Sequence, residues 1–144
     1  MQSDQKLTDA LRARGQRVTL PRLMVHRFVA RAPQHVTAED IHRELPTLSF
    51  ATIYSTLDLL EQLRLVRRVS TLEGTAVYDS RTDPHDHAVC RVCGRMFDVE
   101  PAEVPRTTVP RGFQVEQAQV QIIGVCADCL SRRLAGRLKP LRSS

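Results

Sequence analysis

Two Cys-x-x-Cys pairs constrain this chain more than any other feature of its sequence. They are Cys90 with Cys93 and Cys126 with Cys129, and they contain all four cysteines of the 144 residues. In a reducing compartment such pairs bind metal more often than they form disulfides. Four thiolates around one ion make a closed, tetrahedral zinc site. The 32 residues between the pairs exceed a simple zinc ribbon, so we expect the intervening strands to fold back and join one structural Zn²⁺ site.

The same cysteine pairs also allow a redox function. A thioredoxin-like dithiol belongs next to a βαβ pattern, and neither pair has such a pattern around it. We therefore favour the zinc site and keep a thiol oxidoreductase as an alternative.

The first part of the chain has helical periodicity and clear helix start signals. Gly15 ends a first helix, and Thr19 followed by Pro21 begins a second. Thr37 and Asp40 have the spacing of a capping box at the start of a third helix. These signals predict three helices before residue 46.

A fourth helix and a hairpin follow. Ser49 is placed to cap residues 50–63, whose apolar positions lie on one helical face. The short turn at 46–49 between the third and fourth helices is typical of a helix-turn-helix. Residues 65–70 and 75–79 have strand character and flank a turn at 72–74. A helix-turn-helix followed by a β-hairpin is a winged helix.

Charge is unevenly distributed along the chain. Residues 1–35 hold seven basic and two acidic residues, residues 36–129 hold nine and fourteen, and residues 130–144 hold five and none. Of the 21 basic residues 19 are arginine, which suits bidentate contacts with phosphate. A basic front end indicates a polyanionic partner. A solvated basic surface explains the same counts, and the C-terminal run could equally be a frayed tail.

A second group of metal-binding side chains surrounds the start of the cysteine region. His85 and His87 are two residues apart, so in a strand they point to the same side. Asp79 and Asp98 flank them, and His35 lies upstream, just before the third helix. We interpret the two neighbouring histidines as ligands of a transition metal.

A metalloenzyme that uses His85, His87 and Asp98 in hydrolysis is the alternative. It is disfavoured because no obvious general base lies in the segment around His85 and His87. His26 and His42 lie inside expected helices, and we interpret both as structural.

No membrane segment or secretory signal is expected. No stretch approaches the roughly 18 apolar residues that a membrane span needs. The first residues have no apolar segment of the kind that a secretory signal contains. We expect a cytoplasmic protein with no membrane partner.

Five segments together resemble the Fur superfamily of bacterial metalloregulators. They are RVT at 17–19 with Arg22, HVTAEDIH at 35–42, ATIYSTLDLL at 51–60, VYDSRTDPHDHAVCRVCG at 77–94 and GVCADC at 124–129. The resemblance covers roughly residues 5–133. It implies an α+β fold with an N-terminal winged-helix DNA-binding domain (1–79), a hinge (80–86) and a C-terminal α/β dimerisation and metal-binding domain (87–144). It also implies a homodimeric repressor, not an enzyme, that binds a palindromic double-stranded operator.

The resemblance assigns the metal ligands residue by residue. Cys90, Cys93, Cys126 and Cys129 match the structural zinc site, and His35, Asp79, His85, His87 and Asp98 match the regulatory site for Fe²⁺ or Mn²⁺. This ligand set is similar to that of the peroxide-sensing PerR branch, since iron-sensing Fur proteins have glutamates at the two aspartate positions. It implies that peroxide would oxidise His35 or His85 beside bound Fe²⁺ and release DNA. A manganese, iron or zinc uptake regulator without peroxide sensing is the alternative.

The chain departs from the family pattern at a second metal site. Pro84 replaces one histidine ligand of that accessory site, and Gln117 and Ala118 stand near another. Only Asp86 remains, and we interpret it as a solvated loop acid. The proline-rich residues 99–113 predict that the helix usual there is short or missing.

The predicted DNA contacts come from two groups of residues. Side chains near the start of the fourth helix would enter the major groove: Ser49, Thr52, Tyr54 and Ser55. Arginines outside that helix could contact phosphates: Arg17, Arg22 and Arg67. For Arg67 a solvated hairpin edge is the alternative.

Overall fold

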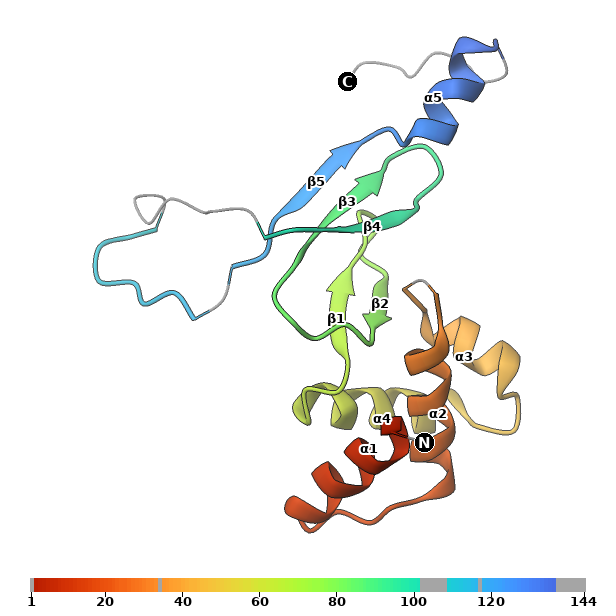
Figure 1. The fold of residues 1–144 in the computed structure, drawn as a ribbon, viewed down its shortest axis with the longest axis vertical. Coiled ribbons are helices and arrows are strands. Elements are labelled where there is room, and N and C mark those ends of the chain that lie inside the picture. Colours follow the sequence, from red (N-terminus) through yellow and green to blue (C-terminus); the bar gives the residue numbers. More distant parts are fainter. Residues whose placement is uncertain (1, 34, 102–108, 117, 137–144) are drawn as a thin grey trace. The chain divides into compact units, whose positions relative to one another are not determined.

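The computed structural model describes residues 2–33, 35–101, 109–116 and 118–136, and these form two compact units that divide between Asp83 and Pro84. Figure 1 shows the elements of both units. The N-terminal unit contains α1 (Gln2–Ala13), α2 (Leu20–Arg31), α3 (Ala38–Glu44), α4 (Phe50–Gln62), β1 (Arg67–Ser70) and β2 (Ala76–Asp79). The C-terminal unit contains β3 (Asp86–Cys90), β4 (Met96–Val99), β5 (Gln121–Gly124) and α5 (Ala127–Leu134).

Local start signals position the helices of the N-terminal unit. The capping box before α3 is confirmed, because the Asp40 N–H donates to Thr37 Oγ1 (3.1 Å) and the Thr37 N–H donates to Asp40 Oδ2 (2.9 Å). The Ser49 hydroxyl oxygen accepts the N–H of Thr52 (3.1 Å) at the start of α4. Each bond satisfies a backbone donor that the first helical turn leaves without an intrahelical partner. Helices α3 and α4 form the predicted helix-turn-helix.

The wing is a two-stranded antiparallel hairpin. Strands β1 and β2 pair from Arg67 opposite Asp79 to Ser70 opposite Ala76. Gly74 lies in the turn at φ +83°, a conformation that a side chain disfavours. A β-bridge joins Val36 to Tyr78, with backbone bonds of 3.0 and 2.8 Å. The bridge attaches the wing to the segment before α3.

The N-terminal unit has a continuous apolar core. The core cluster consists of buried residues from the four helices, the α2–α3 segment, Val66 and β2, and all of its members belong to this unit. His26 is buried, with Nδ1 3.2 Å from the Ser3 hydroxyl, and burial lowers its pKa. His42 Nδ1 lies 2.9 Å from the carbonyl oxygen of Leu48. Both histidines contact neighbours within this unit, which agrees with a structural interpretation.

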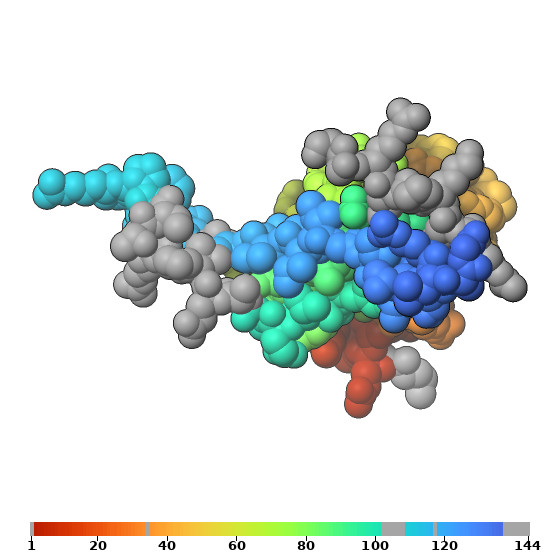
Figure 2. Space-filling model, turned by 90° about the horizontal axis from the view of Figure 1, so that it is seen from above, coloured from red at the N-terminus to blue at the C-terminus, as the bar shows by residue number. Residues whose placement is uncertain are grey.

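The C-terminal unit is a three-stranded sheet in the order β4-β3-β5. Strand β3 pairs antiparallel with β4 and parallel with β5. The alternating pattern of residues 113–125 predicts one long strand, and this is wrong: β5 spans Gln121–Gly124. Strand β5 pairs with β3 at four positions, from His87 to Cys90, and the alternating pattern of the sequence extends beyond these pairs. Figure 2 shows β5 and α5, in blue, at the molecular surface.

Within the parts of the chain that the structure describes, no helix is long and apolar enough to cross a bilayer. The proline-rich segment falls largely at residues 102–108, which lie outside the described ranges.

Candidate metal centres

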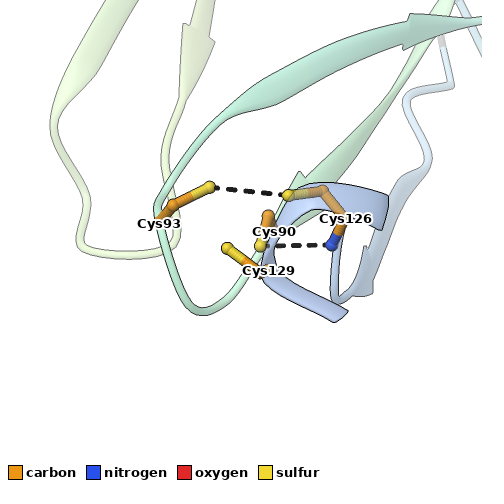
Figure 3. Close-up of side chains that lie close together, drawn as sticks. All are labelled: Cys90, Cys93, Cys126 and Cys129. Carbon is orange, nitrogen blue, oxygen red and sulfur yellow. Dashed lines mark hydrogen bonds between the residues drawn. The ribbon is translucent and has the colours of Figure 1, made fainter. Parts of the chain in front are cut away.

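Sheet topology explains how the two cysteine pairs meet. Cys90 ends β3 and lies opposite Gly124 of the parallel strand β5. The chain therefore leaves β5 beside the first pair, and Cys126 and Cys129 follow at the N-cap and in the first turn of α5. All four sulfur atoms lie within 4.8 Å of one another (Figure 3).

The spacing of the sulfur atoms fits a tetrahedral ion. Thiolates about 2.3 Å from a central Zn²⁺ are about 3.8 Å apart along a tetrahedral edge. The sulfur atoms of Cys93 and Cys126 are separated by 3.8 Å. Cys90 and Cys129 are buried, whereas Cys93 is exposed. The cluster therefore fits a structural zinc site that is open to solvent on one side.

The surroundings shift the pKa values of the two buried thiols in opposite directions. The Cys126 N–H donates to the sulfur of Cys90 at 3.3 Å (Figure 3). Burial raises the pKa of Cys90, but hydrogen bonds from three backbone N–H groups, that of Cys126 foremost, outweigh burial and lower the pKa to about 6. Burial raises the pKa of Cys129 to about 12. Backbone donors thus prepare Cys90 as a thiolate ligand, whereas the thiolate of Cys129 requires a neighbouring cation.

Sequence reasoning missed a basic side chain at this centre. Arg95 Nη2 lies 3.3 Å from the sulfur of Cys126 and 2.6 Å from Oδ2 of Asp128. Hydrogen bonding from the Arg95 guanidinium lowers the pKa of Cys93 and that of Asp128. The available signal was a basic residue directly after the Cys-x-x-Cys-Gly turn.

The C-terminal half-site, defined as His85, His87 and Asp98, lies on β3, β4 and the residue before β3. His87 and Asp98 are direct cross-strand partners in the β3–β4 register. Oδ1 of Asp98 is 3.5 Å from Nε2 of His85 and 3.6 Å from Nε2 of His87. Ligand atoms about 2.1 Å from one ion are about 3.0 Å apart at a right angle and about 3.4 Å apart at the tetrahedral angle. This geometry fits a divalent ion bound between two imidazoles and one carboxylate.

The N-terminal half-site, defined as His35 and Asp79, lies in the other unit. His35 precedes Val36 and Asp79 follows Tyr78, so the β-bridge between Val36 and Tyr78 places the two side chains together. Nε2 of His35 is 3.5 Å from Oδ2 of Asp79, and both side chains are largely buried. One imidazole and one carboxylate supply a neutral donor and an anionic donor, the types that Fe²⁺ and Mn²⁺ accept.

The interpretation of Asp86 as a solvated loop acid is wrong. Asp86 begins β3 and is 5% exposed. Its Oδ1 accepts the N–H of Val120 at 2.9 Å. A buried carboxylate needs such donors, and this bond ties the start of β3 to the residue before β5.

Some of the expected DNA-contacting side chains are exposed, and others bond to neighbours within the protein. On α4, Tyr54 is 42% exposed and Ser55 is exposed, whereas Ile53 and Leu57 are buried on the opposite face. Sequence reasoning missed Phe50, which is 40% exposed one turn before Tyr54, with ring centroids 6.4 Å apart. The i, i+4 spacing of these two aromatic residues was the available signal.

The remaining expected DNA contacts also differ in their accessibility. Ser49 and Thr52 bond to each other at the N-cap of α4. Arg17 is exposed, whereas the Arg22 guanidinium donates to the carbonyl oxygen of Arg17 and to Oε1 of Gln16. Arg67 is half-buried at the start of β1.

A winged helix and a second unit with a four-cysteine metal centre define the class of winged-helix metalloregulators. Comparison with known proteins agrees: the model of the Ferric uptake regulator family matches residues 13–123, and the chain belongs to this family.

Its matching relatives are named as regulators. The Peroxide operon regulator of Bacillus subtilis is 29% identical over 130 residues, which are 84% of this chain and 89% of that protein. Ferric uptake regulation protein 1 of Mycolicibacterium fortuitum is 37% identical over 122 residues, 78% of this chain and 75% of that protein. The structure of the ferric uptake regulator of Pseudomonas aeruginosa with manganese has a TM-score of 0.64 and 29% identity, and covers 83% of this chain and 97% of its own.

Proposed function

We propose that this chain represses transcription when a regulatory ion is bound and that it senses peroxide through that ion. The observation that carries the proposal is the pairing of histidine with carboxylate in each unit, at 3.5 Å in the N-terminal half-site and 3.5 and 3.6 Å in the C-terminal half-site. The proposed regulatory ligands are His35, Asp79, His85, His87 and Asp98. The proposed structural zinc ligands are Cys90, Cys93, Cys126 and Cys129.

The proposed switch depends on the two half-sites lying in different units of the chain. We take residues 1–79 as the DNA-binding domain, 80–86 as the hinge and 87–144 as the dimerisation and metal-binding domain. Ligands from both domains would bind one ion and restrain the hinge. Since ion binding favours the arrangement that it fits best, it shifts the population towards a DNA-binding form.

The choice of peroxide as the signal rests on the two carboxylates. A glutamate, which the family resemblance implies for iron-sensing Fur proteins at these positions, is one methylene longer than Asp79 or Asp98 and would hold an ion differently. Bound Fe²⁺ would supply one-electron chemistry towards peroxide, and Mn²⁺ would not. His35 and His85 are the side chains that we expect to be oxidised, and an oxidised imidazole is a poorer ligand.

Peroxide should separate Fe²⁺-loaded from Mn²⁺-loaded protein. We expect the Fe²⁺ form to lose operator binding in a gel shift, and His35 or His85 to gain the mass of one oxygen atom. The Mn²⁺ form should bind DNA before and after the same dose. Peptide mass spectrometry and the gel shift are measured on the same samples.

Zinc content is the control in this experiment, because oxidation of the cysteines would also release DNA. Zinc must stay bound while the Fe²⁺ form loses DNA. Unmodified histidines with intact Fe²⁺-dependent binding would favour the second candidate, an uptake regulator without peroxide sensing. The observation that favours this second candidate is the 37% identity to a ferric uptake regulation protein.

We further propose that α4 reads the operator. Its buried face carries Ile53 and Leu57, and the opposite face presents Tyr54 and Ser55 near the helix start. A recognition helix contacts base edges with its N-terminal residues, and a two-fold dimer presents two such helices to a palindrome. Ser49 and Thr52 complete the proposed base-reading group, and Arg17, Arg22 and Arg67 the proposed phosphate contacts. The proposed location is the cytoplasm, where the protein would meet its operator DNA.

Tyr54→Ala should weaken operator binding by roughly 1–3 kcal/mol if the ring contacts a base edge. Metal content should not change, because Tyr54 is exposed and contributes to neither metal centre. Fluorescence anisotropy against operator and scrambled DNA measures the effect, which should be confined to the operator.

Arg17→Ala is the comparison variant. As a phosphate contact it should weaken binding to both DNAs and reduce the salt dependence by about one unit. Unchanged affinity in both variants would place the DNA-binding surface elsewhere.

We also propose that a second copy binds the C-terminal unit. Strand β5 lies at the edge of the sheet and carries Ile122 and Ile123, which are 49% and 57% exposed. Leu130 and Leu134 are exposed on α5 at i, i+4 spacing. An apolar edge strand favours pairing with another chain, and a homodimer would cover it.

A further inference from the structure

A four-cysteine zinc centre carries more negative charge than its ion neutralises. Four thiolates and one Zn²⁺ leave a net charge of −2, and thiolates are the reactive form of cysteine. Here the centre is not enclosed: Cys93 is exposed and Cys126 is half-buried, whereas Cys90 and Cys129 are buried. An oxidant therefore reaches the centre on the side of Cys93 and Cys126.

Arg95 covers that side of the centre. Its Nη2 donates to the sulfur of Cys126 at 3.3 Å. The same nitrogen is 2.6 Å from Oδ2 of Asp128, which lies between the two cysteines of the second pair. The guanidinium also lies 5.7 Å from the centre of the Phe97 ring. Two neighbours therefore hold the cation against the accessible sulfur.

The backbone of Arg95 belongs to the same turn. Its carbonyl oxygen accepts the N–H of Cys90 at 2.9 Å, and the Gly94 N–H donates to the carbonyl oxygen of Cys90 at 2.8 Å. The side chain therefore projects from a backbone segment that the first cysteine pair positions. Its place beside Cys126 follows from the fold of the turn and from Asp128.

We propose that Arg95 is a positioning residue that protects the zinc centre from oxidants by neutralising part of its excess negative charge. In the reaction that it slows, two zinc-bound thiolates give two electrons to one hydrogen peroxide. One S–S bond forms, the O–O bond breaks, two hydroxide ions leave and Zn²⁺ is released. A charge-assisted hydrogen bond to a thiolate lowers its nucleophilicity. The inference rests on the four-cysteine centre and not on peroxide sensing at the regulatory site.

The test follows zinc release from the zinc-loaded full-length protein with a chromogenic chelator. With hydrogen peroxide, Arg95→Ala should release zinc several-fold faster than the natural chain, because the thiolate loses the charge-assisted hydrogen bond that lowers its nucleophilicity. Arg95→Lys should lie between them, because it keeps the charge but loses the planar fork. The matched control is Arg91→Ala: Arg91 is exposed in the same turn, and its bond to the carbonyl of Gly124 comes from its backbone N–H.

The rate of zinc release into the chelator without peroxide shows whether a variant merely binds zinc more weakly or has lost protection from the oxidant. Protection predicts that the ratio of the peroxide-driven rate to the chelator-driven rate rises in Arg95→Ala and stays unchanged in Arg91→Ala. Asp128→Asn should raise the ratio by a smaller factor, because the guanidinium loses its anchor but remains. If Arg95→Ala does not fold, Arg95→Lys and Asp128→Asn supply the same comparison. Ratios equal to that of the natural chain in the folded variants would overturn the proposal.

Discussion

Cys93→Ser should abolish zinc binding and leave the C-terminal unit unfolded. The reason lies in the core of that unit. The buried apolar residues that the structure describes there are Val89, Cys90 and Cys129, whereas the apolar core cluster lies entirely in the N-terminal unit. Two of those three residues are proposed zinc ligands, so we expect metal binding to supply most of the folding free energy of this unit. For structural zinc that energy is on the order of 10 kcal/mol.

Metal analysis, circular dichroism and size-exclusion chromatography test this prediction together. We expect no stoichiometric zinc, no dimer and retained helical signal from the N-terminal unit. Val92→Ser is the matched control, because it places the same new side chain in the same turn without removing a ligand. A stable, zinc-free dimer of Cys93→Ser would rule out the four-cysteine centre.

Asp98→Ala should abolish metal-dependent DNA binding while zinc stays in place. One oxygen of Asp98 faces Nε2 of both His85 and His87, so the substitution leaves two neutral imidazoles without their anionic partner. Hard divalent ions prefer carboxylates. Loss of a ligand should weaken Mn²⁺ binding by more than the roughly 10- to 100-fold typical of an outer-shell partner.

A Mn²⁺ titration of operator binding, read by fluorescence anisotropy, measures this effect. Asp83→Ala is the control, because Asp83 is an exposed acid that pairs with Arg81 and belongs to neither half-site. A titration curve of Asp98→Ala that matches that of the natural chain would remove Asp98 from the regulatory site.

Local signals were sufficient for the N-terminal unit. Thr37 with Asp40 and Ser49 act within one helical turn, and the structure confirms both caps. The hairpin turn could also be predicted from the sequence, because Gly74 supplies a backbone conformation that few other residues adopt. The spacing of the cysteines predicted the four-cysteine cluster for a related reason, since each pair is a local unit.

Pairing between residues that are distant in the sequence could not be predicted in the same way. Nothing local sets His87 opposite Asp98 or limits β5 to four residues, because strand register depends on a partner distant in sequence. Asp86 was misjudged because its acceptor role depends on Val120, 34 residues further along the chain. Arg95 was missed for the same reason, since its partners Cys126 and Asp128 lie in the second pair, more than 30 residues further along the chain.

We expect zinc to bind before the regulatory metal, because strand β3 joins the two proposed metal centres. It carries a proposed regulatory ligand, His87, and a proposed zinc ligand, Cys90, about 10 Å apart along one strand. The turn that returns the chain from β3 to β4 contains Cys93, so zinc binding anchors the turn that sets Asp98 opposite His87. A slip of one residue would move Asp98 to the other face of the sheet. We therefore expect that, in a cell short of zinc, the protein would not respond to its regulatory metal, however abundant that metal is.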